Sequence, residues 1–403
     1  MNYHLPFIFL FIIGSQASIT LSFSSSFKDD IEFLSNHTTV EILSSPDGLA
    51  KVAVCPEYQG RIITSTAGGD QGISFGWINR DLIASGENNR HFNAFGGEDR
   101  FWLGPEGGQF SLYFAPQDPF DLAHWFTPPP INEEPFHVVK QTATSLTLEK
   151  EMRLQNYSRA FFELLVQREI KLLETQDITS LLQTALPEDI QYVAFESDNR
   201  ITNIGSAPWR KETGLLSIWI LGMFNPSDGT TIVIPYQPGP EDELGPLIND
   251  RYFGKVPEDR LVIAERTIYF KGDGKHRSKI GLTQQRALPV LGSYDSANGV
   301  LTLVQYSIPG EPRDYVNSMW EIQDNPYSGD AINSYNDGPP EPGKKPLGPF
   351  YELETSSPAA ALSEQESLAH QHRTFHFTGA RESLDRIAQT TLGVGLDEIE
   401  SIF

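Results

Sequence analysis

The sequence predicts a mostly β protein, built as a large antiparallel β-sandwich with a short helix near the C-terminus. Segments in which apolar and polar residues alternate dominate the 403-residue chain, as expected for half-buried strands. The 33 glycines and 28 prolines cluster between these segments and predict many turns and long loops. A convincing helical periodicity occurs once. Two packed antiparallel sheets satisfy this pattern.

Eight segments carry β-branched or aromatic residues at alternate positions and are predicted to be strands: 39–43, 51–54, 61–65, 145–152, 161–172, 230–235, 261–270 and 299–307. The helix is predicted over residues 381–392, where Leu384, Ile387, Ala388 and Leu392 fall on one face. Residues 397–403 can continue it. No internal repeat occurs at a fixed period, so we expect one continuous domain.

The N-terminus is predicted to be a signal peptide. An apolar run from Leu5 to Ile13 is followed by small residues up to Ala17, which is the pattern of a cleavable export signal. The run is about half of the roughly 20 residues needed to span a bilayer. We therefore expect a signal peptide at 1–17, a linker at 18–36, a β-sandwich domain at 37–403, and a secreted or periplasmic bacterial protein without a membrane span.

Composition narrows the class of partner. The net charge of −23 argues against nucleic acid and anionic membranes as partners. It also disfavours a strongly anionic polymer, unless a local basic patch lies in the binding site. The single cysteine, Cys55, excludes an internal disulfide and is expected in the core. The sequence leaves the oligomeric state open.

The densest chemical motif is FGGEDRFWLGPEGGQF at residues 95–110. Its glycines permit sharp turns and close approach of a ligand. An arginine in it can fork onto a carboxylate or a hydroxyl pair, and a tryptophan can stack on a sugar ring. An alternative is a glycine-rich bend braced by an internal arginine–carboxylate pair. The candidate substrate-binding residues of this motif are Glu98, Asp99, Arg100, Trp102 and Glu106.

Further candidates lie on both sides of this motif and in the middle of the chain. His91 and His124 stand beside aromatic residues, and histidine is the usual general acid or base near neutral pH. Asn199, in a polar and strand-like segment, and the amide- and aromatic-rich segment 314–337, with Trp320 and Asn336, are suited to binding hydroxyl groups. A Ca²⁺ site from Asp330, Asn333 and Asp337 is an alternative for the latter segment, although the spacing does not match an EF-hand.

The segment FYELETSSP near the C-terminus carries two acidic residues at alternate positions. Strand geometry puts Glu352 and Glu354 on one face, where two carboxylates repel and one pKa rises. His370 and His372 share a face in the same way. No zinc-binding spacing, phosphate loop or dinucleotide fingerprint is present, so we expect no metal and no cofactor.

Three segments together resemble the galactose mutarotase-like superfamily: GGEDRFWLGPEGGQ, ITNIGSAPW followed by SIWILGMF, and FYELETSSPAAAL with HRTFHFTG. They are most similar to a group of uncharacterised secreted bacterial proteins. The resemblance runs from about residue 37 to the end. It implies a β-supersandwich with a carbohydrate site on its concave face.

The resemblance also implies roles for individual residues. In aldose epimerases of this superfamily a late-strand glutamate is the base, which here corresponds to Glu352 or Glu354. Those enzymes use a mid-chain histidine as the acid. The segment ITNIGSAPW has asparagines where that histidine would lie, so His91 or His124 would have to supply the acid from another loop.

These observations favour a carbohydrate-active protein that uses a Glu/His acid–base pair on a mono- or oligosaccharide. The reaction would be that of an isomerase of the epimerase type, or of a lyase or hydrolase. One alternative is a non-catalytic carbohydrate-binding protein that uses the same cleft, with tryptophans as stacking platforms. Another is a structural envelope protein in which the same residues only brace loops.

Overall fold

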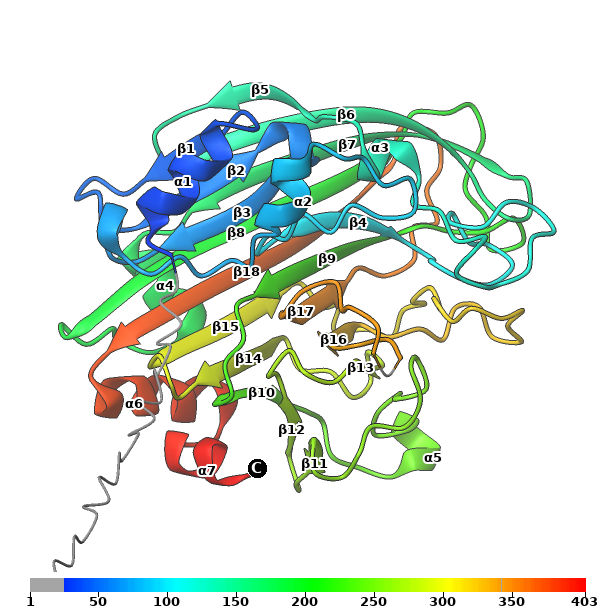
Figure 1. The fold of residues 1–403 in the computed structure, drawn as a ribbon. Helices are drawn as coiled ribbons and strands as arrows, with labels where there is room; N and C mark the ends of the chain where they lie inside the picture. Colours follow the sequence, from blue (N-terminus) through cyan, green and yellow to red (C-terminus); the bar gives the residue numbers. More distant parts are fainter. Residues whose placement is uncertain (1–24, 342) are drawn as a thin grey trace, which may run out of the picture.

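The computed structural model describes residues 25–341 and 343–403, and most of its regular structure is β (Figure 1). The largest sheet has ten antiparallel strands. Their order in the sheet is β11 (Leu261–Ile263), β12 (Thr267–Lys271), β10 (Thr230–Pro235), β14 (Val290–Asp295), β15 (Val300–Tyr306), β18 (Ser367–Gly379), β8 (Ile190–Asn203), β7 (Phe161–Leu172), β6 (Ser145–Gln155) and β5 (His137–Gln141).

Two smaller sheets complete the β structure. A five-stranded antiparallel sheet has the order β13 (Ser278–Leu282), β16 (Ile332–Asn336), β17 (Tyr351–Ser356), β9 (Ser217–Phe224) and β4 (Arg100–Gly104). A three-stranded sheet has the order β1 (Glu41–Ser44), β2 (Lys51–Cys55) and β3 (Arg61–Thr66). The large antiparallel β-sandwich predicted from the sequence is therefore confirmed.

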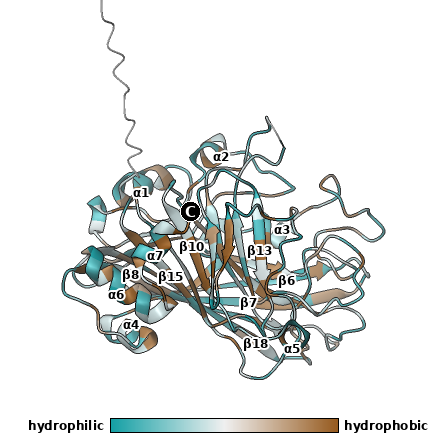
Figure 2. Cartoon of the chain, turned by 90° about the horizontal axis from the view of Figure 1, so that it is seen from below, coloured by the Kyte–Doolittle hydropathy of each residue, from teal (hydrophilic) through white to brown (hydrophobic). Residues whose placement is uncertain are grey.

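Apolar side chains hold the five-stranded sheet against the ten-stranded sheet. Ile220 and Leu353 belong to buried clusters that also contain Val166 and Val304 of the larger sheet. Removing such apolar surface from water is the main stabilising contribution to a fold of this kind. Figure 2 shows the apolar segments concentrated along the strands in the middle of the molecule.

Helices close the ends and the outer side of the sandwich. α4 (Thr175–Leu182), α6 (Arg381–Leu392) and α7 (Leu396–Ser401) bury apolar side chains in a cluster with Leu303, Phe375 and Phe377 of the ten-stranded sheet. The predicted C-terminal helix begins and ends as expected. The remaining short elements lie in connections: η1 (Pro56–Tyr58), η2 (Gly69–Gln71), α2 (Arg80–Ser85), α3 (Pro129–Asn132) and α5 (Glu241–Leu244).

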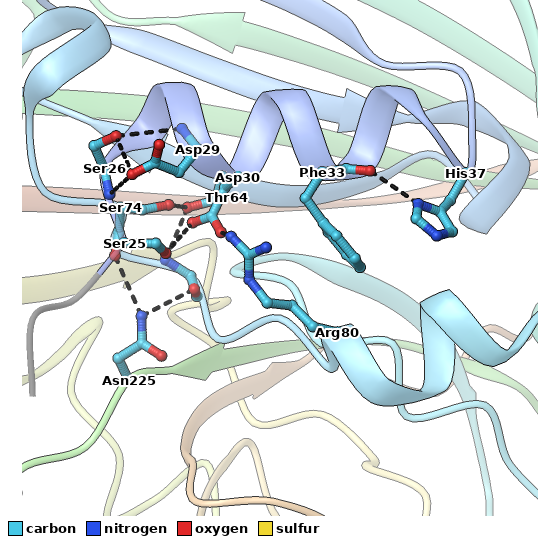
Figure 3. Close-up of polar contacts among 11 residues, drawn as sticks. Ser25, Ser26, Asp29, Asp30, Phe33, His37, Thr64, Ser74, Arg80 and Asn225 are labelled. Atoms are coloured by element: carbon cyan, nitrogen blue, oxygen red, sulfur yellow. Dashed lines mark hydrogen bonds and ion pairs between the residues drawn. The ribbon is translucent and has the colours of Figure 1, made fainter.

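The linker predicted for residues 18–36 is wrong for its described part, because Phe27–Ser35 form helix α1. Ser26 caps it, accepting a hydrogen bond from Asp29 N while the Asp29 carboxylate accepts one from Ser26 N. Asp30 is buried and pairs with Arg80 of α2 (Figure 3). Ser26, which the sequence placed in a linker, therefore acts as a helix cap. The signal peptide predicted for residues 1–17 lies outside the described residues.

Most predicted strands occur where expected, and Phe161–Leu172 and Thr230–Pro235 match their predicted bounds. The segment predicted as one strand at 261–270 is a hairpin instead. β11 turns back on β12, and Ile263 lies opposite Ile268. Within residues 25–341 and 343–403, no helix is long and apolar enough to cross a membrane.

Candidate functional site

The two faces of the five-stranded sheet differ in character. On the face toward the larger sheet, Thr355 reaches His370 and His372 of β18, and Tyr351 reaches Ser293 of β14. Side chains at the alternate positions point away from the larger sheet. The residues of that second face are therefore fixed by the strand register.

Two rows of directly opposed residues cross this second face. The first row is Arg100, Leu221, Glu354, Asn333 and Gly281. The second row is Met223, Glu352, Tyr335 and Lys279. Each row runs across hydrogen-bonded strands about 4.8 Å apart. The register thus brings together charged groups that lie far apart in the sequence.

We call this surface, with the loop residues that cover it, the charged face. Its members, which carry the chemistry discussed below, are Arg100, Trp102, Glu106, Trp125, Trp219, Lys279, Trp320, Glu352 and Glu354. The strand residues among them are at most 8% exposed, whereas Glu106 and Trp320 are partly exposed. The loop residues therefore form the rim of the site and the strand residues its floor.

Glu354 is held from two sides. Lys279 Nζ lies 3.0 Å from Oε1 and 2.9 Å from Oε2, and Trp219 Nε1 donates a hydrogen bond of 2.9 Å to Oε2. Burial opposes the charge of Lys279, but Glu354 and Glu352 outweigh it and raise the pKa of Lys279. Glu354 is thus a fixed partner of Lys279, and both of its carboxylate oxygens already accept hydrogen bonds.

The other two carboxyl groups favour their protonated forms. Burial, and then the neighbouring Glu354, hold the pKa of Glu352 well above its usual value. Burial raises the pKa of Glu106 to about 7, against the influence of Lys279 and of the indoles of Trp320 and Trp125. Trp125 Nε1 itself lacks a partner within hydrogen-bonding geometry. Glu106 is therefore the carboxyl group best placed to gain and lose a proton near neutral pH.

Arg100 is a buried guanidinium without a hydrogen-bond partner in the part of the chain that the structure describes. Its side chain is 1% exposed, and Nε, Nη1 and Nη2 all lack an acceptor. Its Cζ lies 3.8 Å from the ring centre of Trp102 and 4.5 Å from that of Phe92. Burial, and then the nearby Arg61, hold the pKa of Arg100 well below its usual value.

The motif GPEGGQ forms a loop that holds the rim residues close to the strand residues of the charged face. A Cβ on Gly107 would lie 2.3 Å from Met319 O, and one on Gly108, whose φ is +80°, would lie 2.6 Å from Gln323 Nε2. Only glycines let this loop approach the loop that carries Trp320 so closely. The Trp320 ring stacks on Trp125 at 5.8 Å and 24°. The sequence predicted that these glycines let a ligand approach the backbone closely. In the structure, another loop of the chain makes this close approach.

The two candidate histidine acids lie elsewhere. His124 is exposed and pairs with Asp121 at 2.6 Å, which raises its pKa. His91 lies 2.6 Å from Trp125 O through Nδ1 and stacks on Phe126. The structure does not bring either imidazole into contact with Glu352 or Glu354. Both histidines brace the loop that carries Trp125.

Four predicted binding residues point away from the charged face. Glu98 lies between the sheets, where Oε2 is 2.7 Å from His376 Nε2 and accepts from Ser65 Oγ. Asp99 pairs with the buried Arg168 and accepts from Ser197 Oγ at 2.6 Å. Asn199 donates to Ser197 Oγ, and Asn336 donates to His276 O.

We call the buried polar groups between the sheets the interior network: Asp99, Arg168, Ser197, Asn199, Thr355, His370 and His372. Burial lowers the pKa of His370 to about 3 and that of His372 to about 4. Both rings are therefore neutral under ordinary conditions, and they share Thr355 Oγ1 at 2.8 Å each. The shared face of these histidines, predicted from alternation, is confirmed, and it faces the core.

Of the residues weighed for calcium, Asn333 donates to Asp330 at 3.5 Å, whereas Asp337 has a separate set of partners. Asp330 Oδ2 accepts from Tyr252 Oη at 2.5 Å and from Asn249 Nδ2, whereas Asp337 accepts from Tyr335 Oη and Gly348 N. Among the described residues, no group of three or more His, Cys, Asp or Glu is placed to hold a metal ion. Two surface hollows of about 480 and 520 Å³ lie beside α1, both bordered by Asn36, His37 and Glu57, and neither is lined by the charged face.

Sequence reasoning placed Glu352 and Glu354 on one face, as the structure confirms, but missed Lys279 and Trp219. Lys279 lies in the short segment SKIGL, and only its pairing with β16 brings it to Glu354. No local motif marks such a residue. Its lone charge within an apolar strand was the one available signal.

The architecture defines the class as a large antiparallel β-sandwich protein, with a charged, tryptophan-rich face on its smaller main sheet. The chain belongs to the family described as "Family of unknown function (DUF6786)", whose model matches residues 25–403. A comparison with curated proteins gives no match.

Two solved structures are similar to this chain. A candidate aldose 1-epimerase from Escherichia coli has 14% identity and a TM-score of 0.49, with 85% of this chain and 99% of the other covered. A galactose mutarotase-like protein from Lactobacillus casei has 12% identity and a TM-score of 0.47, with 84% and 100% covered. Both belong to the superfamily that the sequence motifs resemble. These values describe a likeness in shape and carry no argument about chemistry.

Proposed function

We propose that this protein binds a sugar on the charged face and isomerises it by acid–base catalysis. Glu106 takes a proton from the sugar, and Glu352 donates a proton to it. The observation that carries the proposal is the unequal environment of the carboxyl groups beside one unpartnered arginine. Groups whose pKa values are pushed apart within one site are the usual acid and base of an enzyme. Nothing in this argument depends on the two structural neighbours.

The charged face offers each part that ring opening of a sugar requires. Glu106 is partly exposed and its pKa is about 7, so its ionised form can take the proton of the anomeric hydroxyl. Glu352, whose pKa is held well above its usual value, can donate to the ring oxygen. Trp320 at the rim presents an indole ring on which a pyranose can stack. Lys279 keeps Glu354 as a fixed negative charge that favours protonated Glu352.

This assignment differs from the roles expected from the sequence. Glu354 was a candidate base, but Lys279 and Trp219 occupy its oxygens. His91 and His124 were candidate acids, but Trp125 O and Asp121 hold them outside the charged face. Glu106 was a candidate binding residue and becomes the proposed base.

The test combines calorimetry with NMR of the anomeric protons on mono- and oligosaccharides. Glu106→Gln should lower the rate of conversion by about 100-fold or more, the usual contribution of a positioned acid or base, and leave binding within about threefold. Glu151→Gln, on an exposed strand position, is the matched control and should change neither. Full conversion by Glu106→Gln, at the wild-type rate, would rule out this base.

A second candidate function is carbohydrate binding without catalysis. The stacking of Trp320, Trp125, Tyr113 and Trp102 favours it, because these rings form one continuous aromatic stack with successive ring centres 5.2–5.8 Å apart, and the stack ends at the partly exposed Trp320. Sugar binding by the wild type without conversion of any sugar would select this function. Absence of any sugar binding would reject both functions.

A further inference from the structure

The unpartnered guanidinium of Arg100 indicates the chemical class of the ligand. A charged group taken out of water without hydrogen-bond partners costs several kcal/mol, so natural proteins pair such groups. Two other buried basic groups follow this rule, since Lys279 pairs with Glu354 and Arg168 with Asp99. Among the described residues, Arg100 has no such partner.

Two aromatic rings border Arg100 without satisfying its donors. Phe92 and Trp102 lie against its guanidinium at 4.5 and 3.8 Å from Cζ to the ring centres. The two rings are perpendicular to each other, so they flank the guanidinium from two sides and its N–H groups remain available to donate. The acidic groups near enough to influence it, Glu352 and Glu106, make no hydrogen bond to it. Among the described residues no acceptor reaches Arg100, so a bound ligand can supply one.

We propose that the sugar bound at the charged face carries an anionic oxygen group, which Arg100 holds through paired hydrogen bonds. This inference rests on the proposed function and specifies its substrate class. Planar guanidinium groups suit carboxylate, sulfate and phosphate because two N–H groups can meet two oxygens at once. Arg100 supplies the local basic group without which the charge of −23 disfavours an acidic ligand.

The charges around the site allow an anion to enter. The charge of Lys279 is balanced by Glu354, and that of Arg100 is unbalanced. Glu106 and Glu352 hold protons more firmly than free carboxyl groups do, which lessens their repulsion of an anion. Glu106 and Trp320 are partly exposed, whereas Arg100 is closed off. An anionic group bound to Arg100 would therefore lie inward of these two partly exposed side chains.

The test measures calorimetric affinities for matched pairs of neutral and anionic sugars. The probes are glucose, galactose and mannose, each beside its uronic acid, its 6-sulfate and its 6-phosphate. The wild type should bind at least one anionic member tenfold or more tightly than its neutral counterpart. This preference should weaken as salt rises. The anionic sugar that binds most tightly identifies the anionic group.

Variants of Arg100 complete the test. Arg100→Gln should abolish the preference, and Arg100→Lys should keep part of it, since a lysine retains the charge but not the paired donors. Arg153→Gln, at a surface position, is the matched control and should retain the preference. Circular dichroism of each variant confirms folding.

Three results would overturn the inference. Equal or tighter binding of the neutral sugars by the wild type would reject it while leaving sugar binding intact, and so would a preference that survives in Arg100→Gln. Binding of no sugar at all would reject the proposed function together with the inference. If the Arg100 variants do not fold, the comparison of neutral and anionic sugars with the wild type still tests the inference.

Discussion

Two buried arginines of this protein, Arg168 and Arg100, lie in opposite situations. Arg168, in the interior network, is 0% exposed and pairs with Asp99, which also accepts from Ser197. Arg100, on the charged face, is 1% exposed and has no hydrogen-bond partner. Both sit beside aromatic rings. Burial alone therefore does not separate these two arginines, but the presence of a partner does.

The interior network also contains polar atoms without a protein partner, among them Arg168 Nε and His372 Nε2. Each belongs to a side chain that is already anchored through another atom, Arg168 through Nη2 and His372 through Nδ1. Isolated atoms of this kind are commonly satisfied by ordered internal water. Arg100 differs because every one of its donors lacks a partner.

The largest expected effect comes from breaking the paired arginine. Asp99→Ala should lower the free energy of unfolding by about 3–5 kcal/mol, because it leaves the Arg168 charge buried without a counter-charge. Urea denaturation measures this loss. Asp228→Ala removes the exposed ion pair with Lys275 and should cost far less, because water and salt screen this pair. A loss as small for Asp99→Ala would mean that the interior pair is not what stabilises this region.

The same contrast shows what the sequence could predict. Period-two alternation is a local property, so it gave the strands, the shared face of Glu352 and Glu354, and that of His370 and His372. Which face of a strand points into the core depends on the neighbouring strands. The adjacent residues Glu98, Asp99 and Arg100 all read as binding residues, yet the first two serve the interior and the third the charged face.

Partners that are distant in sequence were the other limit of the prediction. Lys279 reaches Glu354 through strand pairing across 75 residues, and Arg168 reaches Asp99 through the packing of two sheets across 69 residues. No local pattern encodes such pairs. Helix α1 was missed for another reason. Its serine-rich start reads as a linker until the cap at Ser26 and the burial of Phe27 and Leu34 are seen.

An intermediate effect should appear in the pH dependence of stability. The pKa of Glu106 in the folded protein is raised to about 7, so its contribution is fully present below the unfolded value near 4.5 and is lost as the pH rises through 7. The free energy of unfolding of the wild type, relative to Glu106→Gln, should fall by about 1–2 kcal/mol between pH 4.5 and 7.5. This figure is reduced for the partial exposure of the carboxyl group.

The interior histidines should give the opposite slope. The lowered pKa values of His370 and His372 mean that the unfolded chain binds more protons between about pH 4 and 6.5. Their contribution is therefore present above pH 6.5 and is lost on acidification. Denaturation curves of Glu106→Gln and His372→Gln across this range separate the two slopes. If the two pH dependences of stability had the same sign, the proposed difference between the charged face and the interior network would be wrong.

The smallest effect, and the sharpest test of the comparison, concerns removal of each guanidinium. Arg168→Met leaves Asp99 buried without its counter-charge and should destabilise the protein. Arg100→Met removes a buried charge that has no partner, so in the absence of ligand it should leave the free energy of unfolding unchanged or raise it by up to about 1 kcal/mol. A side chain whose removal stabilises the fold is retained for binding. If Arg100→Met were as destabilising as Arg168→Met, Arg100 would be a structural residue and the charged face would lose its basic binding group.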